Sequence, residues 1–330
     1  TAAGTLALVQ GDVPEARRLQ EEGLALWRAG PDLLGTAGAL NSLGATLLQE
    51  GAPARAEALC EEGLALRRAA GDRAGMGWSL LTLGAIALGD ADAARARGHL
   101  REAIAILRES GDRWGTANAL GLMGALAEHE RDYHLARPLL RESLAIHREV
   151  GDPAGIAHVL STLGDVALGE GHSDAARALY AESLRQRRDQ ENPAEVAISL
   201  EDFAGLAAAG RDSQRALRLL DAATALRASL GAPRPLAEER RITRALAGLG
   251  GAPQLRPAEA RLPAGGSPLS LPEAIGYALQ DAPPPGGVPG LDDAGDGDGS
   301  AGAAGTEGPP AAQAGATSLA FFSMASRRAS

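Results

Sequence analysis

The sequence predicts an all-α solenoid of antiparallel helix pairs, and three observations point to this fold class. A unit of 40 residues recurs up to about residue 230, with a small residue at one fixed place, at Gly44, Gly84, Gly124, Gly164 and Ala204. Alanine recurs twelve residues further on, at Ala16, Ala56, Ala96, Ala136, Ala176 and Ala216. Within each unit, apolar residues are spaced three or four apart, which is the helical period. A period of this length predicts units that bury their apolar faces against their neighbours.

The start of each unit is marked by a residue that can cap a helix. These residues are Asp32, Asp72, Asp112, Asp152 and Asn192. Such side chains accept hydrogen bonds from the first free amides of a helix, and proline follows the last two, where it suits the first helical position. Each unit is then expected to hold two helices of about 15 residues. We expect a partial repeat over 1–29 and full repeats at about 30–70, 71–110, 111–150, 151–190 and 191–230.

The residues at the repeating positions resemble the tetratricopeptide repeat. The matching residues in one copy are Leu80, Leu83, Gly84, Ala87, Ala96, Leu100 and Ala103, and in another Leu160, Leu163, Gly164, Ala167, Ala176, Tyr180 and Ser183. The 40-residue length is similar to the long variety of kinesin light chains and bacterial signalling regulators. HEAT repeats share the length but not this pattern of glycine and alanine. The resemblance covers residues 1–230 and implies a right-handed superhelix whose first helices line a concave, protein-binding groove.

The regular period stops after Gly231. We expect capping helices within 231–281, one amphipathic over 235–249 and a short one from Ser270 to Leu279. This region resembles the C-terminus of large bacterial signal-transduction ATPases and LuxR-type regulators. Residues 282–330 are rich in glycine, proline, alanine and aspartate, a composition that predicts a disordered tail. Because Ala3-Gly4 falls in the register of Leu43-Gly44, we also expect a repeat that starts upstream of Thr1.

Composition excludes several classes of function. The net charge is −10, and all 32 basic residues are arginine, so lysine-based chemistry is ruled out. An acidic chain with 3% aromatic residues is not typical of a nucleic-acid surface. Cys60 alone can form no intrachain disulfide, and its apolar register indicates a buried, inert thiol. No apolar run approaches the roughly 18 residues of a membrane span. The resemblance to bacterial regulators implies a cytoplasmic protein.

Two patterns that invite a metal site are better explained without one. His129-Glu130 with His134 has one residue too many for the zinc-binding helix motif and spans a predicted turn. The acidic stretch 292–298 lacks the glutamate that closes a calcium loop and lies in the predicted tail. No nucleophile–base pair is visible either, and we therefore expect no catalytic residue, metal or cofactor.

Two charged ladders follow the same period on the second helices. One consists of Glu22, Glu62, Glu102, Glu142 and Glu182, and the other of Arg28, Arg68, Arg108, Arg148 and Arg188. We interpret them as a solvated outer ridge, with each arginine near a helix C-terminus that its charge stabilises. A binding stripe for phosphate or acidic groups is the alternative.

The first helices carry the candidate binding site. Their segments 37–49, 77–89, 117–129, 157–169 and 197–209 contain no arginine. A helix that is apolar nearly all round is normally covered on both sides. The resemblance places Asn41, Ser42, Trp78, Leu81, Asn118, Leu122, His158, Ser161, Asp165 and Glu201 in the groove. Packing between repeats is the alternative for each of them.

These observations predict a non-catalytic interaction and regulatory scaffold, the arm of a larger bacterial signalling or transcriptional regulator. Its partner is expected to be a protein or peptide with an apolar helical face, and not nucleic acid or membrane. The chain's own helix at Leu271–Leu279, with Ile275 and Leu279 on one face, is a candidate plug for the groove. The alternative function is a sensor whose groove binds a small apolar inducer and controls an upstream ATPase.

Overall fold

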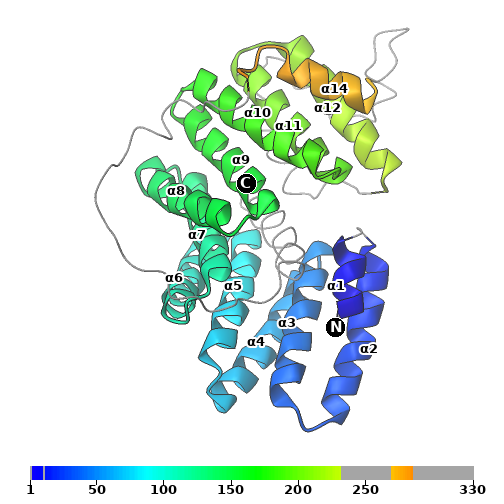
Figure 1. Ribbon diagram of the computed structural model, residues 1–330, viewed down its shortest axis with the longest axis vertical. Coiled ribbons are helices and arrows are strands. Elements are labelled where there is room, and N and C mark those ends of the chain that lie inside the picture. The colour runs from blue at the N-terminus through cyan, green and yellow to red at the C-terminus, as the bar shows by residue number, and fades with distance from the viewer. Residues whose placement is uncertain (1, 10–11, 232–268, 285–330) are drawn as a thin grey trace. The chain divides into compact units, whose positions relative to one another are not determined.

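The computed structural model describes residues 2–9, 12–231 and 269–284, which contain helices and no strands. These residues form two compact units, one up to Gly155 and one from Ile156 onward. Within each unit, successive helices pack in antiparallel pairs, as Figure 1 shows. The fold is therefore the all-α solenoid of helix pairs that the repeat predicts.

The helices follow the 40-residue period closely. Unit 1 contains α1 (Ala2–Val9), α2 (Val13–Ala29), α3 (Leu33–Gln49), α4 (Pro53–Ala70), α5 (Arg73–Gly89), α6 (Ala93–Glu109), α7 (Arg113–His129) and α8 (Tyr133–Glu149). The helix α9 (Pro153–Gly169) begins in unit 1 and continues into unit 2, followed by α10 (Ser173–Asp189), α11 (Pro193–Ala209), α12 (Ser213–Ser229) and α14 (Leu271–Leu279). The odd-numbered helices up to α11 are called first helices below, and the even-numbered helices up to α12 second helices.

The predicted caps fix where the helices begin. The carboxylates of Asp32, Asp72 and Asp112 accept the amides of Gly35, Gly75 and Gly115 at 2.9, 2.9 and 2.7 Å. The turns between helices need a left-handed residue, which Gly71 supplies with φ of 70°. At one such turn the residue is Ala91, with φ of 59°, where a side chain is less favourable than glycine. Most repeat helices are 17 residues long, slightly longer than expected.

The recurring small residues let the paired helices approach closely. Ala96 and Ala136 on second helices are completely buried. A Cβ atom added to Gly84 would lie 2.7 Å from the Leu100 side chain, and one on Gly124 would lie 2.6 Å from Leu140. Because protein interiors are close-packed, these positions have no room for added volume. The predicted close-packing positions are confirmed.

The two helices of a pair also approach closely at a second position, where a residue of the second helix meets the backbone of the first helix. The Ser143 hydroxyl donates to the Ala117 carbonyl at 2.7 Å, and Ser183 donates in the same way to Ala157 at 2.6 Å. These bonds satisfy buried polar groups at the contact between a second helix and its first helix. In an earlier repeat the same position is Gly63, where a Cβ would lie 3.1 Å from the carbonyl oxygen of Ala37.

The charged ladders lie on exposed second helices, as interpreted from the sequence. They also pair between repeats: Arg28 binds Glu62 at 2.7 Å, and Arg108 binds Glu142 at 2.5 Å. The four side chains are about half exposed. Ion pairs of this kind contribute only about 0–1 kcal/mol each.

The short C-terminal helix was correctly predicted, but not the face that it buries. The structure packs α14 against α10, α11 and α12 within unit 2 (Figure 1). The buried residues are Ala274 and Ala278, whereas Ile275 and Leu279 are only partly buried. Two of the three neighbouring helices, α10 and α12, are second helices, and the third, α11, is a first helix. Small side chains allow the close contact that the larger ones would prevent. The predicted helix at 235–249 and nearly all of the predicted tail lie outside the described residues.

Candidate functional site

A tryptophan pair forms the most distinctive part of the first-helix face in unit 1. Trp78 of α5 and Trp114 of α7 have ring centroids 5.1 Å apart with planes inclined by 30°. The Trp78 indole N–H donates to Asp112 at 2.9 Å, and the Trp114 indole donates to Asp152 at 2.8 Å. Both rings are half-buried. Each ring therefore keeps some accessible surface while its polar edge is fixed.

The two aspartates also cap the next first helices. Asp112 accepts the Gly115 amide with one carboxylate oxygen and the Trp78 indole with the other. Asp152 is bound in the same way by Gly155 and by Trp114. Each indole is therefore positioned by the start of the following repeat.

A buried histidine lies next to the second of these aspartates. His147 is completely buried, with Nδ1 3.0 Å from Asp152. Burial raises the pKa of Asp152, but hydrogen bonds from His147, the Gly155 amide and Trp114 outweigh it, so that the pKa is lowered overall. Asp152 is therefore held as a carboxylate near neutral pH.

The other predicted groove residues of unit 1 differ in accessibility. Leu81, Asn118 and Leu122 are fully buried, and the Asn118 amide donates to the Trp114 carbonyl at 2.8 Å. Asn41 and Ser42 are half-buried, and the Ser42 hydroxyl donates to the Gly38 carbonyl at 3.0 Å within its own helix. Trp78, Asn41 and Ser42 are thus the predicted residues of this unit that retain accessible surface. Trp114 was missed, although it is one of three tryptophans in the chain.

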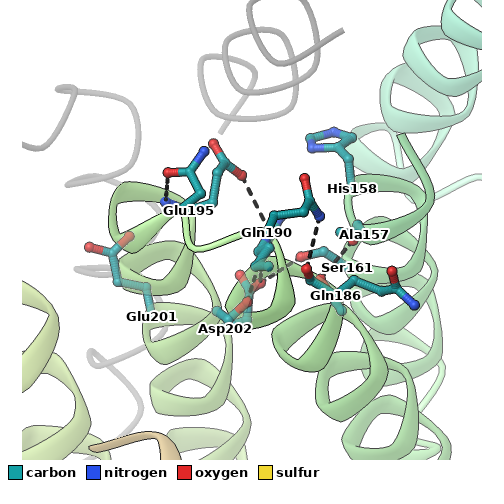
Figure 2. A network of polar contacts seen from close by, with 12 residues as sticks. Ala157, His158, Ser161, Gln186, Gln190, Glu195, Glu201 and Asp202 are labelled. Atoms are coloured by element: carbon teal, nitrogen blue, oxygen red, sulfur yellow. Dashed lines mark hydrogen bonds and ion pairs between the residues drawn. The ribbon is translucent and has the colours of Figure 1, made fainter. Parts of the chain in front are cut away.

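The predicted residues of unit 2 belong to a buried polar network, shown in Figure 2. Ser161 of α9 donates to Asp202 of α11 at 2.5 Å. Arg187 of α10 approaches the same carboxylate at 3.6 Å, and it also reaches Glu195 at 3.3 Å and the Ser199 hydroxyl at 2.8 Å. The guanidinium therefore compensates the buried Asp202 and the partly buried Glu195.

Glu201 lies on another side of α11 (Figure 2) and forms its own ion pair. Arg227 of α12 binds it through two nitrogens, at 2.8 and 3.0 Å. The exposed fractions of the two side chains are 0% for Glu201 and 7% for Arg227. Parallel hydrogen bonds of this type are stronger than single neutral ones.

The two remaining predicted residues have different surroundings. Asp165 is half-buried and accepts the Tyr180 hydroxyl at 2.7 Å, within its own helix pair. His158 is buried on α9 (Figure 2). On the first helices of unit 2, Glu201 and Asp202 are thus paired with arginines of the same unit, and Asp165 accepts a hydroxyl.

Sequence reasoning missed Arg187 and Arg227. Both lie one residue before the position of the ladder that contains Arg188, where Arg67 also stands. Glu201 and Asp202 are the signal for them, because an acid in an apolar helix requires a cation from a neighbouring element.

The described residues show no larger chemical centre. No three histidine, cysteine, aspartate or glutamate side chains among them gather to hold a metal ion. None of the described helices is long and apolar enough to cross a membrane. Cys60 is buried, and burial raises the pKa of its thiol to about 12.

The comparisons with known proteins identify the repeat. The family model described as tetratricopeptide repeat matches residues 1–69, 35–109 and 115–189, which together make up more than half of the chain. The chain belongs to the tetratricopeptide repeat family. Repeats of this family generally mediate protein–protein interactions.

Two solved structures are similar to this chain. BtubC (BKLC) from P. vanneervenii is 20% identical, with a TM-score of 0.51, over 69% of this chain and 94% of that one. A P. anserina protein assigned as a kinesin light chain, with nearly identical TPR-like repeats, is 15% identical, with a TM-score of 0.46, over 59% of this chain and 96% of that one. A comparison with curated proteins found no match. At 20% identity the likeness to BtubC concerns the fold alone.

Proposed function

We propose that this tetratricopeptide repeat chain is a non-catalytic interaction module that binds an apolar helical segment on the first-helix face of unit 1. The observation that carries the proposal is the half-buried pair of Trp78 and Trp114, fixed by Asp112 and Asp152. Large rings held in place contribute contact area at low entropic cost and often dominate protein interfaces.

The charge distribution favours an apolar partner over an acidic one. The first-helix segments 37–49, 77–89 and 117–129 carry no arginine. In unit 2, Arg187 and Arg227 are buried and already bound to acids of the same unit. A carboxylate that entered these faces would lose its hydration without gaining a cation.

Calorimetric titration with two synthetic peptides tests the proposal. We expect an amphipathic helix of leucine and alanine to bind, and a peptide with an acidic C-terminus not to bind. Trp78→Ala should weaken binding by about 2 kcal/mol, as truncation of an interface anchor does. Trp27→Phe is the matched control, because Trp27 is exposed on the second helix α2. Binding of the acidic peptide alone, or equal binding to the Trp78→Ala and wild-type chains, would exclude this site.

We further propose that the module is the regulatory arm of a larger cytoplasmic bacterial signalling or transcriptional regulator. The support is the resemblance of residues 231–279 to the end of such proteins. Determination of the full coding sequence tests it, and a gene without an ATPase or output domain would refute it.

A sensor function is the second candidate, because the same exposed indole surface suits a small apolar molecule. In that case apolar compounds should raise the melting temperature of the wild-type chain and should not raise that of Trp78→Ala. A library of such compounds that leaves both melting temperatures unchanged would exclude the sensor.

A further inference from the structure

Consecutive second helices leave a groove between them, and in unit 2 the short helix α14 is seated there. Arg215 of α12 donates to the carbonyls of Tyr277 and Ala278 at 3.0 and 3.3 Å and pairs with Asp281. Its guanidinium and that of Arg218 lie 5.4 and 5.1 Å from the centre of the Tyr277 ring. The C-terminal end of α14 is therefore held by cations, as its dipole favours.

The residues of α10 and α12 at this groove are buried. Ala181 and Leu184 of α10 and Leu219 of α12 are all 0% exposed. Four repeats earlier, 160 residues back, the corresponding residues are Glu21, Leu24 and Leu59, which line the groove between α2 and α4.

In unit 1 the corresponding groove is open. A hollow of about 480 Å³ lies between α2 and α4, with Leu24, Leu43 and Leu59 among its lining residues. Leu59 is only partly buried, and Glu21 is exposed. The same repeat geometry thus presents one groove with a helix in it and one without, in which Leu59 keeps accessible surface above the buried Leu24 and Leu43.

An arginine marks the open groove as well. Arg55 corresponds to Arg215, and its side chain is 66% exposed, with Glu21 at 3.9 Å. In the next repeat, the residue that corresponds to Arg55 is Arg95, and it forms an ion pair with Glu57 of the preceding second helix. Arg55 has no such acid, because the residue of α2 that corresponds to Glu57 is Arg17. Arg55 is therefore held more loosely than its counterparts and can turn toward a ligand.

We propose that the α2/α4 groove is a docking site for a short helix of a partner protein with the chemistry of α14. Such a helix has small residues four apart on its buried side, like Ala274 and Ala278, and an acid just after its C-terminus, like Asp281. Arg55 binds the last carbonyls and the acid, and the helix covers the apolar floor. This surface lies between two second helices, with Leu43 of the first helix α3 at its base, and it does not include the tryptophan pair of the site proposed above.

One difference between the grooves argues against α14 of a second copy as the occupant. Glu21 stands where unit 2 has Ala181, and residues 269–284 contain no basic side chain to meet it. A docked helix end would draw Arg55 away from Glu21, which it now approaches at 3.9 Å, and a carboxylate left buried without a cation is unfavourable. The natural partner is therefore a helix that also carries lysine or arginine opposite Glu21.

A labelled peptide of residues 269–284 and fluorescence anisotropy on the full chain test this site. Glu21→Ala makes the groove match unit 2 and should tighten peptide binding several-fold. Arg55→Glu should weaken binding about tenfold, because it removes a charge-assisted contact and adds repulsion. The peptide with Asp281→Arg should restore binding to Arg55→Glu. Arg101→Glu, an exposed change on α6, is the matched control and should have no effect.

Three results would overturn the proposal. The first is no binding of the peptide to the Glu21→Ala chain at millimolar concentration. The second is binding that responds to Arg215→Glu and not to Arg55→Glu, which would place the peptide in the groove of unit 2. The third is sedimentation of the wild-type chain alone as an oligomer that Arg55→Glu dissociates, which would make a second copy the occupant.

Discussion

The buried pair of Glu201 and Arg227 allows a quantitative test of how unit 2 is stabilised. We expect Arg227→Leu to destabilise the protein strongly, because Glu201 would remain a buried carboxylate with 0% of its side chain exposed. Removal of one partner from a buried ion pair costs about 3–5 kcal/mol. The two hydrogen bonds at 2.8 and 3.0 Å give a similar figure, since a bond to a charged group contributes about 1.5–3 kcal/mol.

The chain itself supplies the matched control. Three repeats earlier, the positions of Glu201 and Arg227 are occupied by Leu81 and Leu107, both buried. The double variant Glu201→Leu/Arg227→Leu should therefore recover most of the lost stability, because well-packed apolar residues can replace a buried ion pair. Glu201→Leu alone should cost less than Arg227→Leu, since a long arginine side chain can move its charge toward water.

Urea unfolding monitored by circular dichroism measures the three variants, and hydrogen exchange locates the change. In a repeat array each repeat contacts only its neighbours, so the loss of protection should centre on α11 and α12. The reasoning is refuted if Arg227→Leu costs less than about 1 kcal/mol, which is the level of an exposed pair. It also fails if the double variant is as unstable as Arg227→Leu.

Three further predictions concern other buried positions. Ala136→Leu should lower stability by about 1–3 kcal/mol in thermal unfolding, because Ala136 is completely buried in a helix crossing; an unchanged melting temperature would contradict this packing. The pKa of Asp152 is lowered in the folded protein, so its contribution to the free energy of unfolding is complete above the unfolded pKa of 3.8 and is lost as the pH falls through the folded value. Asp152→Asn should remove this part of the acid sensitivity of stability, as measured by unfolding curves at a series of pH values. Cys60, with a pKa of about 12, should react with a thiol reagent at neutral pH only after denaturation, and rapid reaction of the native chain would show that the site opens.

Most of the fold was predictable because the 40-residue period repeats the same local rules. Asp72 and Asp112 mark helix starts in any context, since an aspartate that accepts first-turn amides needs only its own backbone. Gly84 and Ala96 could be predicted as helix contact positions, because close packing explains why a small residue recurs at the same position in each repeat.

The site was less predictable, because it depends on how different helices are aligned. The pairing of Arg227 with Glu201 requires the relative rotation of α11 and α12, which apolar spacing does not determine. The docking of α14 was misjudged for a related reason. Hydropathy favours Ile275 and Leu279 as the buried side, whereas Ala274 and Ala278 are buried and Arg215 holds the end of the helix.

The double role of Asp112 has a consequence for how the array responds to force or to a ligand. One oxygen of its carboxylate closes the first turn of α7, and the other holds the indole of Trp78 in the preceding repeat. Asp152 repeats this arrangement for α9 and Trp114. Unfolding of one repeat therefore breaks the hydrogen bond that positions the indole of the preceding repeat, so that unfolding propagates toward the N-terminus. A ligand that binds both indoles would stabilise the folded repeats and oppose unfolding that starts at the C-terminal side of unit 1.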